Sequence, residues 1–188
     1  MCSYKVKDYK VGLRILIDKD PYVILENEFF KPGKGQAFNR LKLKNLKNGV
    51  ILKKTIKIGE DIELADVIEK EVKFLYFDNN GYCFIDPIYY NYYEVENSII
   101  GTDRNWVVEG LLCTILLWEN EVLSIKLPKV VVLRVVSTED VSRQSVSAKN
   151  FKSSILETGV SIKLPLFIKV NDLVRVDTEK GEYISRVF

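Results

Sequence analysis

Short runs of apolar and aromatic residues, each closed by residues that favour turns, follow one another along nearly the whole chain. Val11–Ile17 and Tyr22–Glu26 flank an Asp-Lys-Asp-Pro turn, and Val72–Phe77 and Tyr82–Ile85 flank Asp-Asn-Asn-Gly. Runs of this length, rich in β-branched and aromatic residues and joined by such turns, are typical of β-hairpins. The chain is therefore expected to fold almost entirely into β-strands.

Two further runs alternate basic and apolar residues, which places one kind on each face of a strand. Ala37–Leu46 and Val50–Ile56 flank Asn48-Gly49 and are expected to form a hairpin with one buried face and one lysine-bearing face. Helix is scarce, and the best candidate is a short turn or helix within Ala65–Lys70 or Asn105–Glu109. The other expected strands are Leu111–Trp118, Val122–Leu127, Val130–Val136, Ser161–Ile168, Leu173–Asp177 and Tyr183–Val187.

The charge of the chain changes sign twice along its 188 residues. Residues 1–65 hold 14 Lys and Arg against 8 Asp and Glu, residues 66–128 hold 4 against 11, and residues 129–188 hold 10 against 7. A segment of about 60 residues is the size of a small domain. We therefore expect three consecutive β-barrels, at residues 1–64, 65–128 and 129–188, rather than one large sandwich. The pentapeptide Ser-Ile-Lys-Leu-Pro occurs at 124–128 and again at 161–165, which adds limited support for two related barrels.

The basic residues are concentrated in the first of these segments. Between Phe29 and Gly59 the chain has nine basic residues and no acidic one. A surface of one positive sign attracts phosphate, so nucleic acid is an expected partner. The alternative is an ordinary solvated sheet face rich in lysine. The nine residues are Lys31, Lys34, Arg40, Lys42, Lys44, Lys47, Lys53, Lys54 and Lys57.

The sequence contains no histidine, which excludes several kinds of catalytic site. Ser-His-Asp and Cys-His nucleophilic sites and the HExxH metal site all need this residue. Cys2, Cys83 and Cys113 are odd in number and far apart, so neither structural zinc nor a disulfide framework is expected. No metal, cofactor or enzymatic activity is therefore expected. The longest apolar runs fall short of the ~20 residues of a membrane-spanning helix, so a soluble cytoplasmic protein without membrane contact is expected.

One loop differs in composition from the other turns. Lys31-Pro32-Gly33-Lys34-Gly35-Gln36-Ala37-Phe38 combines a proline, which fixes φ, with two glycines, which permit backbone conformations closed to other residues. This composition predicts a tight turn with Lys34 at its tip, uncovered by neighbouring side chains. Such a lysine suits a cationic arm that reaches a partner, or a residue that a modifying enzyme must reach. The alternative is a hairpin loop with an ordinary surface lysine. A phosphate-binding P-loop is excluded, because the motif GxxxxGK is absent.

The loop and the segments around it resemble bacterial translation elongation factor P. The resemblance rests on KPGKGQAF with the basic strands LKLKNL and KKT, on DIELADVIEKEVKFLYFD, and on LETGVSIKLPLFIKVNDLVRVDTEKGEYISRV, and it covers essentially the whole chain. It implies an SH3-like barrel followed by two OB-fold barrels in an L-shaped, tRNA-like arrangement. It also implies a factor that binds the 70S ribosome between the P and E sites, beside the peptidyl-tRNA, and promotes peptide-bond formation at consecutive prolines. A monomer is expected.

The resemblance also assigns roles to individual residues. Lys34 corresponds to the family's tip lysine, which in many members is extended by a β-lysyl group, so a lysine-modifying enzyme is an implied partner. The longer cation would lie near the CCA end of the P-site tRNA and position it for a poor nucleophile, proline. The other residues implied to contact tRNA or ribosomal RNA are Lys31, Pro32, Gly33, Gly35, Arg40, Lys42, Tyr183 and Arg186.

The third segment departs from the family pattern at one loop. Gln144-Ser145-Val146 stands where the family usually has Gly-Asp-Thr, which is associated with the E-site codon, and Ser142–Ser154 lacks the relatives' glycines. This departure motivates a second hypothesis, a divergent paralogue or general OB-type RNA-binding protein that does not stimulate peptidyl transfer. An enzyme is a third hypothesis, but no convergent nucleophile, base or metal cluster supports it.

The acidic middle segment contains an aromatic cluster with two alternative roles, a base-stacking platform or a packed core. Because an acidic surface repels phosphate, packing in the core and at sheet edges is the expected role. The cluster comprises Tyr82, Phe84, Tyr89, Tyr90, Tyr92 and Tyr93. Trp106 and Trp118 are expected to anchor barrels, and Cys83 and Cys113 to be buried.

Overall fold

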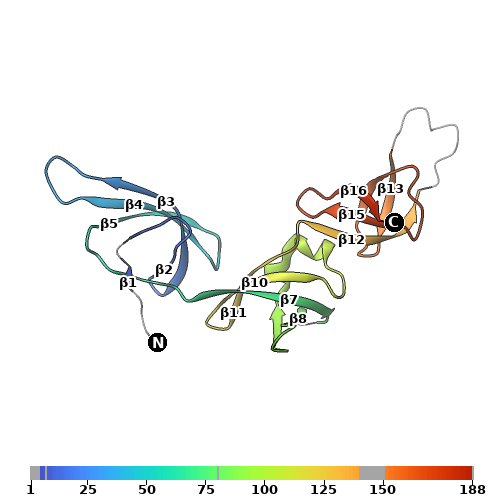
Figure 1. The fold of residues 1–188 in the computed structure, drawn as a ribbon, viewed down its shortest axis with the longest axis horizontal. Helices are drawn as coiled ribbons and strands as arrows, with labels where there is room; N and C mark the ends of the chain where they lie inside the picture. The colour runs from blue at the N-terminus through green and yellow to red at the C-terminus, as the bar shows by residue number, and fades with distance from the viewer. Residues whose placement is uncertain (1–4, 7, 80, 140–150, 188) are drawn as a thin grey trace. The chain divides into compact units, whose positions relative to one another are not determined.

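The computed structural model describes residues 5–6, 8–79, 81–139 and 151–187. In this part of the chain nearly all elements are β-strands, joined into three larger sheets and one two-stranded sheet (Figure 1). The helical elements described are one turn of α-helix, α1 (Asn97–Ile100), and the 3₁₀ helix η1 (Gly101–Trp106). The all-β fold class expected from the sequence is therefore confirmed.

The first large sheet has the strand order β2-β3-β4-β5 and is antiparallel throughout. Asp18 and Lys19 join its first two strands with φ angles of 52° and 70°, a left-handed turn whose twist suits a two-residue hairpin. The strands are β2 (Arg14–Ile17), β3 (Asp20–Phe30), β4 (Phe38–Asn45) and β5 (Ile51–Lys57). Beside them, β1 (Lys5–Val6) pairs with β6 (Ile62–Glu63).

The alternation of β4 decides which face of the first sheet is buried. Leu41 and Leu43 are fully buried and belong to a core that also contains Tyr9, Ile15 and Ile56. Because successive strand residues point to opposite faces, the basic residues between the leucines face outward. The expected division into an apolar face and a basic face is confirmed.

The central sheet has the order β11-β10-β7-β8-β9. The first of these strands along the chain, β7, begins at Val67, so the prediction of a short turn or helix within Ala65–Lys70 is wrong. Val67 is buried and packs with Ala65, Trp118 and Leu123. The helical turns begin before the other candidate, Asn105–Glu109, and overlap it at Asn105 and Trp106. The strands are β7 (Val67–Phe77), β8 (Tyr82–Ile85), β9 (Tyr92–Val95), β10 (Leu112–Trp118) and β11 (Glu121–Lys126).

The aromatic cluster of the central sheet does not pack as a whole. Phe84 is fully buried and contacts Phe74 at a ring-centroid distance of 5.3 Å, and Cys83 and Cys113 are buried as expected. Three members are exposed instead: Tyr89, Tyr90 and Tyr92 have relative exposures of 71%, 70% and 67%. The expectation of core and edge packing is therefore wrong for these three tyrosines: Tyr89 and Tyr90 lie in the turn between β8 and β9, and Tyr92 is the first residue of the edge strand β9.

The third large sheet has the order β14-β13-β12-β15-β16. Its core includes Leu133, Leu156, Leu164 and Val174, and the side chain of Trp106 packs into the same core. The strands are β12 (Val130–Thr138), β13 (Phe151–Leu156), β14 (Ser161–Pro165), β15 (Leu173–Asp177) and β16 (Glu182–Val187). The expected codon-side loop at Gln144-Ser145-Val146 lies outside the described residues.

The chain divides into two compact units, residues 1–70 with 115–124, and residues 71–114 with 125–188. In the first unit, Arg14 donates a hydrogen bond of 3.0 Å to the carbonyl oxygen of Val67 and forms an ion pair with Glu69. In the second unit, Thr178 donates a hydrogen bond of 2.9 Å to the carbonyl oxygen of Pro128. This division does not follow the three sheets, so the domain limits at 64/65 and 128/129 stay predictions.

Candidate nucleic-acid interface

The loop singled out by its composition joins β3 to β4 and projects beyond the first sheet (Figure 1). Residues 31–36, with Lys34 among them, are all exposed. Gly35 has a φ of 112°, a conformation that L-residues rarely adopt, whereas Gly33 lies outside the left-handed region with open space around it. Of the two glycines, Gly35 is therefore the one that the backbone requires, and Lys34 stands between them as expected.

Two aromatic rings close the base of this loop. Phe30 and Phe38 are the last residue pair of the β3–β4 ladder, and their rings stack with centroids 5.4 Å apart and planes 19° apart. The guanidinium of Arg40 lies 4.9 Å from the centre of the Phe30 ring. A stack of two rings and a guanidinium restricts the last ladder pair before the loop, and so limits the directions that the loop can take.

The basic face of β4 is paired with acidic residues of β3. Lys42 Nζ lies 2.6 Å from Glu26 Oε1, and Arg40 stands opposite Glu28 in the β3–β4 register. On its other side Lys42 stands opposite Lys53 of β5. Together these five residues line a groove of about 200 Å³. The face is a row of alternating charges rather than a purely positive surface.

This pairing of acidic and basic residues limits the prediction that the run of basic residues forms a surface of one positive sign. Glu26 and Glu28 precede the run in the sequence, so the run itself contains no acid. The antiparallel register brings them beside Arg40 and Lys42. Of the residues predicted to bind phosphate, Lys31 and Lys34 lie in the exposed loop, while Lys42 is held in an ion pair. The sequence signal that points to this pairing is the Glu-x-Glu spacing ahead of the loop.

Tyr183 and Arg186 are the two further residues predicted to contact tRNA or ribosomal RNA. Both lie on β16 of the third sheet, in the second compact unit. Tyr183 is half-buried against the third core and lines a cavity of about 520 Å³ together with Phe151 and Lys163. Arg186 Nη1 lies 3.6 Å from Asp172 Oδ2. Neither side chain is an unconstrained surface group.

The turn that leads into β16 is organised by one carboxylate. Asp177 Oδ1 accepts hydrogen bonds of 2.9 Å and 3.0 Å from the backbone N–H groups of Glu179 and Lys180. The Lys180 N–H, helped by the Glu179 N–H and by the nearby cations Lys129 and Lys180, holds the pKa of Asp177 below its ordinary value. The carboxylate therefore stays ionised and fixes the turn that places Tyr183.

Two features of the described residues concern metal binding and membrane crossing. None of their His, Cys, Asp and Glu side chains form a group of three that would hold a metal ion. Their helices are all too short or too polar to cross a membrane. What the first sheet offers chemically is an exposed primary ammonium on a loop with a stacked aromatic base, a group of the kind that can interact with an anion.

Sequence models of three protein domains match successive parts of this chain. Residues 5–62 match the KOW-like domain of elongation factor P, residues 67–125 match its OB domain, and residues 131–186 match its C-terminal domain. The three matches follow one another in the order of the three sheets and leave only short segments uncovered.

Solved structures of proteins described as translation initiation factor 5A are similar to part of this fold. Translation initiation factor 5A from Methanococcus jannaschii has a TM-score of 0.53 and 20% identity, and the similarity covers 67% of this chain and 91% of that one. A protein of the same initiation-factor family from Naegleria fowleri has a TM-score of 0.52 and 12% identity, covering 66% of this chain and 99% of that one. Together the three domain matches and the all-β architecture show that this chain belongs to the elongation factor P family of translation factors.

Proposed function

We propose that this protein binds the 70S ribosome between the P and E sites, beside the peptidyl-tRNA, and stimulates peptide-bond formation at consecutive prolines. Its membership of a translation-factor family supports ribosome association as the general activity. The observation that carries the finer proposal is the exposed Lys34 loop on its stacked aromatic base.

In this proposal Lys34 acts by position and charge. Its side chain is long, and nothing on the loop between residues 31 and 36 is buried, so the ammonium can approach the CCA end of the P-site tRNA. Proline is a sterically constrained nucleophile, and holding the two reactants in a productive geometry contributes more than proton transfer does here. Lys31 and Arg40, on the same hairpin, would contact phosphate and fix the loop on the tRNA.

The same exposure suits modification of Lys34. An enzyme that extends a lysine must enclose its amino group, and a lysine at a projecting tip between two glycines meets this need without local unfolding. We therefore propose a lysine-modifying enzyme as a second partner. Intact-mass measurement of the protein from its native host, followed by peptide mapping, is expected to show an adduct on Lys34.

The proposed function is tested by replacing Lys34 in a reconstituted translation system. Lys34→Ala is expected to leave the fold intact and to abolish the rescue of a template that encodes consecutive prolines. The matched control is Lys10→Ala, since Lys10 is a highly exposed lysine of the same domain outside the loop. Lys10→Ala is expected to rescue as well as the unchanged protein.

Equal rescue by Lys34→Ala would overturn the proposal. The second hypothesis, a general OB-type RNA-binding protein, would then be favoured by binding to free single-stranded RNA with a steep dependence on salt and by the lack of binding to ribosomes that carry peptidyl-tRNA.

A further inference from the structure

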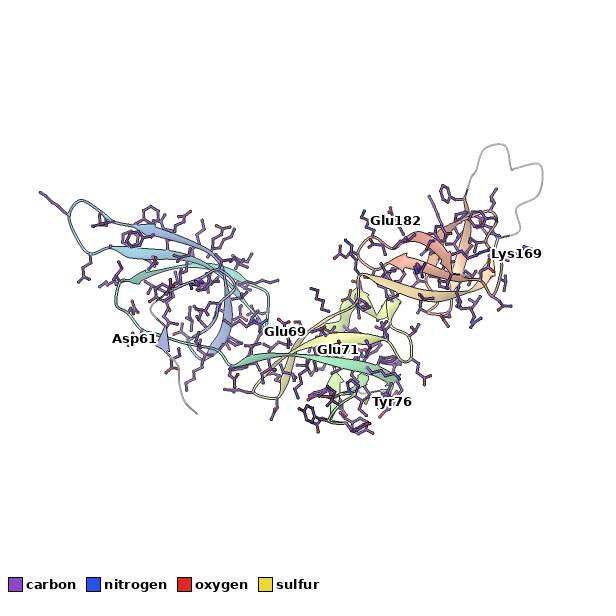
Figure 2. The ribbon with its side chains drawn as sticks, in the orientation of Figure 1. Asp61, Glu69, Glu71, Tyr76, Lys169 and Glu182 are labelled. Carbon is purple, nitrogen blue, oxygen red and sulfur yellow. The ribbon has the colours of Figure 1, made fainter. Side chains whose placement is uncertain are left out.

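A group of exposed aromatic and apolar side chains lies on strands β7 and β9 of the central sheet and on the turn between β8 and β9. Ile88, Tyr89 and Tyr90, in the turn between β8 and β9, have relative exposures of 73%, 71% and 70%. Tyr92 on β9 and Tyr76 on β7, which is labelled in Figure 2, are exposed by 67% and 52%. These five residues are called the tyrosine patch below. Large apolar side chains in one place on a surface are typical of an interaction site.

The turn that presents three of these side chains is ordered and strained. The Asp86 carboxylate is buried and accepts hydrogen bonds of 2.8 Å and 3.0 Å from the backbone N–H groups of Ile88 and Tyr89. The Asp86 carbonyl accepts a further bond of 2.9 Å from the Tyr90 N–H. Tyr90 has a φ of 59°, which is uncommon for an aromatic residue. The fold therefore holds three large side chains in solvent at a cost in backbone energy, as functional surfaces often do.

The two sheet residues of the patch lie close to one another. In the β7–β8–β9 register Tyr76 stands opposite Cys83, and Cys83 stands opposite Glu94. Tyr92 is two residues from Glu94 on the same strand, so it lies on the same face. The neighbouring Cys83 thiol raises the pKa of Tyr76 above its ordinary value, with smaller contributions from burial, from Asp78 and from Tyr92. Tyr76, Tyr92 and Glu94 therefore lie on one face of the sheet.

The charges around the patch indicate which kind of partner fits it. Between Phe74 and Asp103 the exposed charged residues are Asp78, Glu94 and Glu96, all of them acidic. Lys73, just before this stretch, is exposed and stands opposite Ile85, which stands opposite Tyr92, so the exposed charge here is three acids against one lysine. Such a surface repels the phosphates of RNA and of anionic membranes, and it repels a second copy of itself. It attracts a cation that also has an apolar face. The arginine guanidinium meets both needs, because it stacks on tyrosine rings and donates paired hydrogen bonds to carboxylates.

We infer that the tyrosine patch is a docking site for an arginine-rich polypeptide segment of a partner protein. Tyrosines supply rigid ring surfaces of the kind that contribute most at protein interfaces, and Glu94 supplies a carboxylate on the same face. The inference concerns the acidic middle of the chain and does not depend on the role proposed for Lys34.

The inference is tested with a fluorescent peptide of alternating arginine and glycine and the full-length protein. Fluorescence anisotropy is expected to show binding that weakens about tenfold in the double variant Tyr90→Gly, Tyr92→Leu, which removes two exposed ring contacts. Glycine adopts the φ of residue 90 without strain, and leucine keeps residue 92 apolar, so the variant is expected to remain folded by circular dichroism. The single variant Tyr92→Phe keeps the ring and is expected to bind as the unchanged protein does.

Two controls separate ring contacts from general charge attraction. Phe167→Ser removes an exposed apolar side chain of similar exposure, 61%, from the same compact unit and is expected to leave peptide binding unchanged. A lysine–glycine peptide of equal charge is expected to bind more weakly than the arginine peptide. The inference is overturned if the double variant binds the arginine peptide as tightly as the unchanged protein, if Phe167→Ser weakens binding equally, or if the double variant loses binding to single-stranded RNA instead.

Discussion

At the scale of single residues, the basic side chains of the first sheet differ in how readily they can meet phosphate. Lys34 lies in a fully exposed loop, whereas the Lys42 ammonium already contacts Glu26 at 2.6 Å and its side chain is only 33% exposed. A partly exposed ion pair of this kind contributes about 0–1 kcal/mol, so an RNA phosphate could displace Glu26 from Lys42. Because breaking the ion pair costs this energy, the phosphate would bind Lys42 less tightly than it would bind an unpaired lysine. Two lysines that look alike in the sequence are therefore not equivalent.

Removing the paired acid is expected to strengthen RNA binding. Glu26→Gln takes away a carboxylate that competes with phosphate for Lys42, so the affinity for tRNA at low salt rises and the slope of log K against log salt steepens by about one unit. The measurement is a filter-binding titration at several salt concentrations. Glu71→Gln, which removes an exposed acid elsewhere, is the matched control. An identical slope for Glu26→Gln and Glu71→Gln would show that Lys42 does not contact the tRNA.

A second residue-scale prediction concerns Cys113. Burial, with a smaller contribution from Asp103, raises the pKa of this thiol to about 12 from an ordinary value of 9.0. The folded protein therefore holds this proton more tightly than the unfolded chain does, and the free energy of unfolding falls as the pH rises from about 9 towards 12. At neutral pH the thiolate is scarce, so iodoacetamide is expected to label Cys113 only after denaturation, as judged by peptide mass mapping.

At the scale of elements, the β3–β4 hairpin acts as a support for its own loop. Phe30 of β3 stacks on Phe38 of β4, and Arg40 of β4 lies against the Phe30 ring. These contacts connect the two strands at the end of the ladder where the loop begins. Since residues 31–36 bury nothing themselves, the direction of the loop depends on this last ordered pair. The ring pair thus links the register of the sheet to the position of Lys34.

Removing one ring is expected to loosen the loop without unfolding the domain. Phe30→Ala should lower the free energy of unfolding by about 1 kcal/mol, because the ring pair and the guanidinium contact are partly exposed. It should also reduce polyproline rescue while Lys34 is intact. Phe29→Ala removes a more exposed ring, at 60%, from the neighbouring position and should change neither quantity. Urea unfolding and the translation assay provide the two readouts; full rescue by Phe30→Ala would show that the loop does not need this support.

At the scale of the whole molecule, Trp106 connects segments that are distant in the sequence. It ends the 3₁₀ helix of the central segment, yet it packs with Leu133, Val174 and other residues of the third core. A side chain added at Gly181 would meet the Trp106 ring at 3.3 Å, so this contact is close. The third sheet and the segment before β10 therefore share one core within the second compact unit.

Truncating this tryptophan is expected to separate the unfolding of the two parts. Trp106→Ala removes a large buried side chain, which typically costs about 3 kcal/mol or more, and the third core then loses its link to the central segment. Differential scanning calorimetry is expected to show a broadened or split transition. Ile184→Ala, at a position with 48% exposure on β16, is the control and should leave one transition near the original temperature. An unsplit transition at an unchanged temperature for Trp106→Ala would contradict the shared core.

The local patterns of the sequence predicted most of the strands correctly. The alternation around Leu41 and Leu43 predicts β4 and its buried face, because one pair of neighbouring strands is enough to bury every second residue. The early start of β7 at Val67 is not predicted, since it depends on pairing with β10, which is remote in the sequence. Local patterns also miss β1, β6, β9 and β13, although β13 pairs with the next strand along the chain, β14. Aromatic composition predicts packing of Tyr89, Tyr90 and Tyr92 in the core and at sheet edges, but Tyr89 and Tyr90 lie in the turn that Asp86 organises, and Tyr92 begins the edge strand β9.

By itself the sequence determined the all-β architecture, the order of basic and acidic segments, the family, and Lys34 as the residue at a glycine-flanked tip. Each of these depends on composition and on short-range spacing, which the chain carries whatever its tertiary contacts. Only the tertiary structure decided that Glu26 pairs with Lys42, that Phe30 stacks on Phe38, and that a row of tyrosines faces solvent beside Glu94. These depend on the register between strands and on the direction of turns, which place side chains together through long-range pairing.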